Sequence, residues 1–336
     1  MDEAVPSPLT PPAPPPAEFK DRRTGLKIFG VLTILLGAMC AGLVPFMILG
    51  QTINAKATGT PVRISDVLFM VVSLGGMATA LVWLGIGSIM LRRWARALLL
   101  IGSASGLVTG LFGMVGMAFV LPQFSALIQA GQPAGRPPLP EAAKAIAMIF
   151  MGGTIFMIYV VLPTVWLLFY RSPHVKATCE AHDPVPRWTD ACPLPVLTVS
   201  LWLALGVPML LLMPVLYHGV LPFFGVFISG GGGALAYLIL AVVWAWSARA
   251  LYRLDVRGWW VLVIAICVMS LSHVLTYAQR DLMEMYSLMG LPAQQLEQFK
   301  RLNFPSSNLM LWGSLFFLVP FLGYLIYLKR FFRRSA

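Results

Sequence analysis

Two cysteines and two histidines gather in one short stretch, residues 172–193 of the 336-residue chain. They are His174, Cys179, His182 and Cys192, and their spacing is H-x4-C-x2-H-x9-C. Thiolate and imidazole are zinc ligands, and four of them can close a tetrahedral structural site. Ser172 followed by Pro173 favours the start of a short helix, on which Cys179 and His182 would share one face. These four residues are therefore a candidate zinc site.

Two other interpretations of this stretch stay open, because the spacing matches no standard zinc finger. Cys179 and Cys192 could form a disulfide or take part in redox chemistry, although a disulfide is disfavoured if the stretch faces a reducing cytosol. Alternatively, it is an ordinary interfacial loop in which two small thiols are buried. The sequence alone does not decide among zinc, redox chemistry and plain packing.

The same stretch resembles a cytoplasmic loop of uncharacterised multi-pass bacterial membrane proteins. The resemblance is carried by Cys179-Glu180-Ala181, Asp183-Pro184, Trp188-Thr189-Asp190 and Cys192-Pro193. His182 and Ala191 stand where that group has arginine, and this departure argues against His182 as a metal ligand. The resemblance implies a multi-pass membrane protein and carries no activity with it.

The composition of the whole chain indicates a membrane protein. It is 58% hydrophobic and only 11% charged, whereas soluble domains carry about 25% charged residues. This excludes a soluble enzyme, a secreted disulfide scaffold and a disordered chain. The long apolar runs of the chain do not alternate apolar and polar residues as barrel strands do, so we expect an all-α integral membrane protein. Eight apolar runs are each long enough to span the hydrocarbon: 26–50, 67–91, 97–121, 145–169, 194–217, 226–251, 259–277 and 309–328.

The start of the sixth run is the least defined boundary. The chain is apolar from Val220 to Leu251, but it contains Pro222 and four glycines at 230–233. Residues 221–225 are either a re-entrant or interfacial lead-in or the first part of an unusually long helix.

The basic residues predict the orientation of these helices. With eight spans, 17 of the 24 Lys and Arg residues fall on the side that holds both termini. The positive-inside rule then places both termini in the cytoplasm. The resemblance to bacterial membrane proteins implies that the membrane is a bacterial inner membrane. The net charge of +11 is explained by contact with anionic lipid headgroups, so we expect no nucleic-acid partner.

Spacings along the chain indicate an internal duplication. Basic turns ending in Trp94 and Trp259 follow the second and sixth spans. The separation of these tryptophans nearly equals that between the starts of the first and fifth spans, and that between the starts of the fourth and eighth. We therefore predict a Pro-rich cytoplasmic tail (1–24), two four-helix halves of the same orientation (25–170 and 195–336) and a connecting Cys/His loop (171–194).

The spans contain almost no ionisable groups. His273 is the only clear one inside a helix, close to its outer end, and an external metal pair with His218 is a further idea. Because intramembrane charges usually mark ion pathways, ion-coupled transport is disfavoured. Three hypotheses follow: a non-enzymatic scaffold, assembly or regulatory component; a permease for a neutral or amphipathic solute moving between the halves; and a membrane enzyme or metal/redox site that uses Cys179, Asp183, Asp190 or Cys192.

Overall fold

Eight helices of the protein are long and apolar enough to cross a membrane, which confirms the predicted all-α class and the number of spans. The computed structural model describes residues 19–58, 62, 64–130, 140–291, 293–302 and 307–332. Most of the predicted N-terminal tail and parts of the two long loops at 122–144 and 278–308 lie outside these described residues. The spans rather than the tail therefore carry the structural account.

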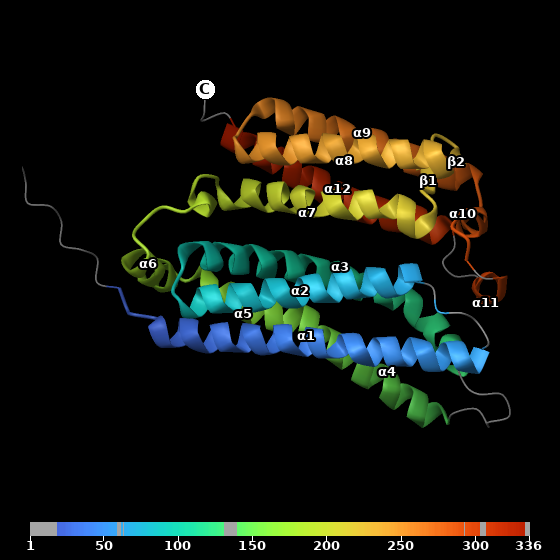
Figure 1. Ribbon diagram of the computed structural model, residues 1–336, viewed down its shortest axis with the longest axis horizontal. Coiled ribbons are helices and arrows are strands. Elements are labelled where there is room, and N and C mark those ends of the chain that lie inside the picture. The colour runs from blue at the N-terminus through green and yellow to red at the C-terminus, as the bar shows by residue number, and fades with distance from the viewer. Residues whose placement is uncertain are drawn as a thin grey trace, which may run out of the picture.

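The spans form two groups of four that lie side by side with their helix axes nearly parallel (Figure 1). The first half contains α1 (Arg23–Thr58), α2 (Ile64–Ile89), α3 (Arg93–Ala130) and a fourth span made of α4 (Glu141–Phe156), a π-helical turn (Met157–Val161) and α5 (Leu162–Arg171). The second half contains α7 (Leu194–Tyr217), α8 (Gly230–Tyr252), α9 (Val256–Gln279) and α12 (Ser307–Phe332). In both halves the first span packs on the second, the second on the third and the third on the fourth.

The connecting loop, residues 172–193, lies at the end of the molecule where α2 turns into α3 (Figure 1). It contains the short helix α6 (Pro173–His182) and one 3-10 turn (Trp188–Asp190). The opposite end carries the strands β1 (Leu221–Phe223) and β2 (Val226–Ile228) and the short helices α10 (Leu282–Leu288) and α11 (Ala293–Leu302). The molecule thus has a loop-covered end and a hairpin-covered end.

The predicted start of the sixth helix at residue 226 is wrong. Residues 221–228 form an antiparallel hairpin of β1 (Leu221–Phe223) and β2 (Val226–Ile228), and α8 begins at Gly230. The hairpin turn donates its backbone N–H groups to α9 hydroxyls, from Phe224 to Ser272 Oγ and from Gly225 to Thr276 Oγ1, both at 3.0 Å. An apolar segment can leave the helix here because these partners satisfy its backbone.

The two basic turns share one backbone geometry. Leu91 and Leu254 both adopt the left-handed conformation, with φ of 57° and 58°. In each turn the next residue donates its N–H five residues back, from Arg92 to Gly87 O and from Asp255 to Ala250 O, at 2.9 Å in both cases. This is a Schellman ending with leucine where glycine is usual. Alignment of the two leucines pairs Arg96 with Trp259, so Trp94 and Trp259 do not occupy the same position.

The fourth span of the first half changes its pitch next to a proline. Pro163 has no N–H to donate to the carbonyl of Tyr159, which lies within the π-helical turn. Gly110 of α3 packs directly on the Tyr159 backbone, and Gly106 lies against Pro163. Of the small residues that line α3, these two contact the fourth span, whereas Gly102, Gly113 and Gly116 face open space.

Substitution of Gly110 tests this packing. Gly110→Ala should lower the thermal stability of the purified protein, because the new Cβ would overlap the Tyr159 carbonyl oxygen; overpacking of this kind costs about 1–3 kcal/mol. Gly113→Ala is the matched control on the same helix, and it should be neutral or slightly stabilising. Equal melting temperatures for the two variants would contradict the contact between α3 and the π-helical turn of the fourth span.

Candidate functional site

The connecting loop is fastened to the α2–α3 turn through one buried carboxylate. Asp183 is 3% exposed and accepts hydrogen bonds from Arg187 Nη2 at 2.6 Å and from Arg187 Nε at 3.1 Å. It also accepts the backbone N–H of Arg93 at 3.3 Å, and Arg92 Nη1 lies 3.7 Å away. The carboxylate therefore joins the loop to the first turn of α3. The hydrogen bonds from Arg187 lower the pKa of Asp183 below its ordinary value of 3.8.

Two further carboxylates of the loop contact the side chain of Arg93. Glu180 Oε1 lies 3.4 Å from Arg93 Nη2, and Asp190 Oδ2 lies 3.3 Å from Arg93 Nε. Asp190 Oδ2 also accepts the backbone N–H of Arg187 at 2.8 Å, which caps the 3-10 turn. The three acidic residues of the loop thus converge on one basic turn. An ion-pair network of this kind fixes geometry more firmly than an isolated surface pair.

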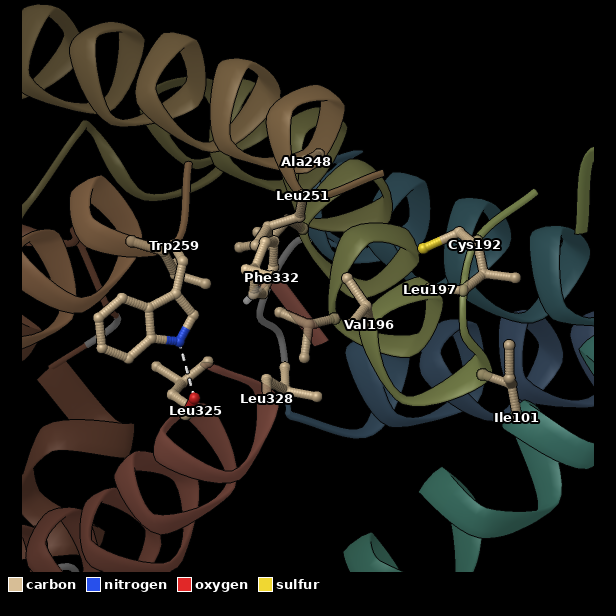
Figure 2. Packing of buried hydrophobic residues seen from close by; sticks show 13 residues of the cluster. Ile101, Cys192, Val196, Leu197, Ala248, Leu251, Trp259, Leu325, Leu328 and Phe332 are labelled. Atoms are coloured by element: carbon tan, nitrogen blue, oxygen red, sulfur yellow. Dashed lines mark hydrogen bonds between the residues drawn. The ribbon is translucent and has the colours of Figure 1, made fainter. Parts of the chain in front are cut away.

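The two loop cysteines are buried in different cores. Cys179 is 1% exposed and belongs to the core of the first half, with Leu26 and Tyr170. Cys192 is 3% exposed and belongs to the core of the second half, with Val196 and Leu197 (Figure 2). A hydrogen bond from Tyr252 Oη of α8 to the Trp188 carbonyl, at 2.9 Å, adds a second attachment to that half. The loop therefore holds both halves at this end.

The core around Cys192 also crosses the boundary between the halves. It includes Ile101 of α3 as well as residues of α7, α8, α9 and α12 (Figure 2). Trp259 closes one side of it and donates its indole N–H to the Leu325 carbonyl at 2.7 Å. Further along, Trp202 Nε1 of α7 donates to Ser105 Oγ of α3 at 2.9 Å. The halves are joined by these contacts and by the loop.

The structure does not bring the four predicted zinc ligands together. Among the described residues, no three His, Cys, Asp or Glu side chains are placed to hold a metal ion. His174 Nδ1 accepts the backbone N–H of Lys20 at 3.4 Å, and exposed His182 bonds through Nδ1 to its own helix at the Thr178 carbonyl, at 2.8 Å. Only Cys179 and Cys192 line a common space. The four residues do not converge because the two imidazoles are turned to other partners.

The thiols are in environments that favour the protonated form. Burial raises the pKa of Cys179 to about 11, although the positive charge of Arg96 opposes this shift. Burial also raises the pKa of Cys192 to about 11, and its Sγ lies 3.7 Å from the carbonyl oxygen of Pro193. The thiolate is the nucleophile and the metal ligand. These positions therefore disfavour thiol chemistry near neutral pH.

At the opposite end of the molecule, His218 and His273 also contact different residues. His273 packs edge to face against Tyr277 of its own helix, with ring centroids 4.4 Å apart. His218 ends α7 in the left-handed conformation and faces Gly290, which follows α10. No group of ligands that includes them forms a metal site within the described part of the chain.

A cavity of about 220 Å³ lies between the connecting loop, the start of α3 and the start of α7. Three cations, two carboxylates, two thiols and one hydroxyl contribute to its wall: Arg93, Arg96, Lys176, Glu180, Asp190, Cys179, Cys192 and Thr189. Sequence reasoning used the arginines only to orient the helices. The sequence offers only a partial signal, the three acidic residues of the loop, because the basic turn that they contact lies about 90 residues earlier in the chain.

Comparison with known proteins gives no relative: no family model, curated protein or solved structure matches this chain.

Removal of the Asp183 charge should loosen the loop. Asp183→Asn keeps the side-chain shape but weakens charge-assisted hydrogen bonds, which are worth about 1.5–3 kcal/mol. We expect Cys179 and Cys192 to react with maleimide about tenfold faster or more than in the parent protein, in a Cys40→Ser/Cys267→Ser background. Asp281→Asn, at the exposed N-cap of α10, is the control and should leave the rate unchanged. Unchanged labelling in Asp183→Asn would show that the carboxylate does not hold the loop.

The same carboxylate predicts a pH dependence. Because its pKa is lowered in the folded protein, Asp183 stabilises the fold above pH 3.8, and the contribution is lost as pH falls through the folded pKa. The difference in melting temperature between the parent and Asp183→Asn should be constant from about pH 5 to 7 and should close in stronger acid. A difference in melting temperature that persists at a pH where Asp183 is protonated would contradict this prediction.

Proposed function

We propose that this protein is a non-enzymatic membrane component that holds two four-helix halves in a fixed arrangement, as a scaffold, assembly or regulatory component. One observation carries the proposal: a single loop has one cysteine in the core of each half, and its three carboxylates contact the arginines of one turn. A movement of one half against the other at this end would have to break the contacts of the loop with the α2–α3 turn or those with the second half, which are the burial of Cys192 and the Tyr252–Trp188 hydrogen bond. A fixed distance between the halves keeps the surface of the protein constant, and a scaffold that binds partner proteins needs a constant surface.

The permease hypothesis is less well supported. It expects a polar cavity between the halves, lined by Ser, Thr and Tyr, within the membrane. The cavity described above lies instead at one end of the spans, and charged groups and thiols form much of its wall. The enzyme hypothesis requires a reactive thiol or a free carboxylate. Cys179 and Cys192 have raised pKa values, and Asp183 and Asp190 are engaged by arginine.

The orientation is part of the proposal. We place both termini and the connecting loop in the cytoplasm of a bacterial cell, with the spans in the inner membrane. The excess of basic residues on that side of the eight spans and the resemblance of residues 179–193 to a bacterial cytoplasmic loop support this placement. Anionic headgroups would then surround the end that carries the α2–α3 and α8–α9 turns.

We also propose that the halves arose by duplication. The two turns share left-handed leucines, matching hydrogen bonds and one close glycine–alanine pair each, all at one constant offset along the chain. The pair is Gly87 with Ala95 in the first turn and Ala250 with Gly258 in the second. A left-handed leucine is uncommon because its Cβ is strained there. Its recurrence with the same neighbours supports a common origin.

A distance measurement across the halves tests the proposed function. Spin labels at Lys56→Cys in the first half and Leu288→Cys in the second should give one narrow distance distribution in nanodiscs, in a background in which all four native cysteines are replaced (Cys40→Ser, Cys179→Ala, Cys192→Ala and Cys267→Ser). Both positions are exposed and lie at the end away from the loop. A permease that rocks its halves would give two populations, and that result would overturn the scaffold proposal.

Two controls separate the loop from the rest of the fold. Asp183→Asn should broaden the distribution, because the loop no longer holds both halves firmly. Asp255→Asn, at the exposed cap of α9, should leave it narrow. Proteoliposomes that contain the protein should swell in neutral solutes no faster than empty liposomes. Fast swelling would favour the permease even if the distribution stayed narrow.

A further inference from the structure

We propose that the cavity beside the connecting loop is a binding site for a phosphate group, with Arg96 and Thr189 as its principal donors. The inference does not depend on the scaffold role. It rests on two groups that have no partner in the contacts described above, the guanidinium of Arg96 and the hydroxyl of Thr189. Both residues line the cavity near the start of α3.

The balance of charges in the cavity wall favours an anion. Glu180 and Asp190 are both paired with Arg93, and Lys176 Nζ lies 3.9 Å from Glu180. Among the described residues, no ion pair involves Arg96. Three cations and two carboxylates leave one positive charge in excess, and it lies on Arg96. A planar guanidinium is the side chain best suited to bind phosphate oxygens.

The polar atoms in the wall also lack partners. Arg96 Nε and Thr189 Oγ1 are buried without a hydrogen-bond partner in the part of the chain that the structure describes. Thr189 is 2% exposed and lines the cavity, as does Arg96. A buried donor without a partner costs about 1–3 kcal/mol. Two residues of the cavity wall, one charged and one neutral, thus each hold a covered donor that the described protein atoms leave unpaired, and a small side-chain rotation would turn it to an acceptor in the cavity.

In the second half, the position equivalent to Arg96 holds a buried tryptophan. Alignment of the two turns on their left-handed leucines makes Trp259 the counterpart of Arg96. Trp259 is 4% exposed, fills its core and has its N–H bonded to Leu325 O (Figure 2). Arg96 neither fills its space nor finds a partner for Nε. The first half therefore keeps a polar opening where the second half is closed.

The size and position of the cavity fit a phosphate group. Its volume of about 220 Å³ is several times the roughly 30 Å³ that one liquid water occupies. Arg96 is three residues into α3, about 4.5 Å from the start of the span. That is close to the depth of lipid headgroups, and basic pockets between helices bind anionic headgroups. The phosphate could thus belong to an anionic lipid or to a free anion in the aqueous phase.

Binding measurements with two probes distinguish these sources. Native mass spectrometry of the full-length protein would titrate phosphatidylglycerol against phosphatidylcholine, and equilibrium dialysis would follow radiolabelled inorganic phosphate. We expect at least one anion to bind saturably at one site. Selective retention of phosphatidylglycerol with no uptake of inorganic phosphate identifies a lipid site. Saturable uptake of inorganic phosphate identifies a site for a free anion.

Matched variants locate the bound anion. Arg96→Gln should weaken binding of the preferred probe about tenfold or more, and Thr189→Val, which keeps the side-chain shape, about threefold. Arg257→Gln removes an exposed arginine from the other basic turn and should bind like the parent. If Arg96→Gln does not fold, as judged by its melting curve, Thr189→Val alone decides. Binding of both probes by Thr189→Val at parental affinity, or by no form of the protein, would overturn the proposal.

Discussion

The position of the connecting loop on the α2–α3 turn depends on the buried carboxylate of Asp183. A carboxylate that is 3% exposed is costly unless charged donors surround it. Here the donors come from Arg187 of the loop and from Arg92 and Arg93 of the α2–α3 turn. That requirement fixes the loop on the turn, and the fixed loop in turn places Cys179 in one core and Cys192 in the other. The ionic contacts thus decide where two apolar residues are buried.

The spans were predictable because the hydrocarbon allows few alternatives. A run of about 20 apolar residues in a bilayer must satisfy its own backbone, so composition alone indicates eight helices. The hairpin at 221–228 was not predictable in the same way. Its backbone partners are Ser272 and Thr276, which belong to a later helix, α9. The apolar pattern of residues 220–229 fits a helix equally well, and only the contact with α9 decides against it.

The connecting loop shows a different limit. Ser172 and Pro173 correctly indicated the start of the short helix α6. Its cysteines and histidines suggested a metal, yet the structure turns His174 and His182 to backbone partners. Instead, Glu180, Asp183 and Asp190 form ion pairs with the arginines of the α2–α3 turn. Ligand type and spacing do not report which direction each side chain takes, and three carboxylates near a distant basic turn become visible as a cluster only in space.

The α2–α3 and α8–α9 turns have the same backbone geometry, but different side chains follow them. Both turns place a side chain at the same position of the following helix, because both end in a left-handed leucine with the same hydrogen bonds. In the second half that side chain is Trp259, which is apolar over most of its surface and satisfies its one N–H on Leu325. In the first half it is Arg96, whose charge cannot be satisfied by an apolar core. A space lined with polar groups follows from that one difference in residue type, and the loop that crosses it supplies Thr189, Glu180 and Asp190 to its wall.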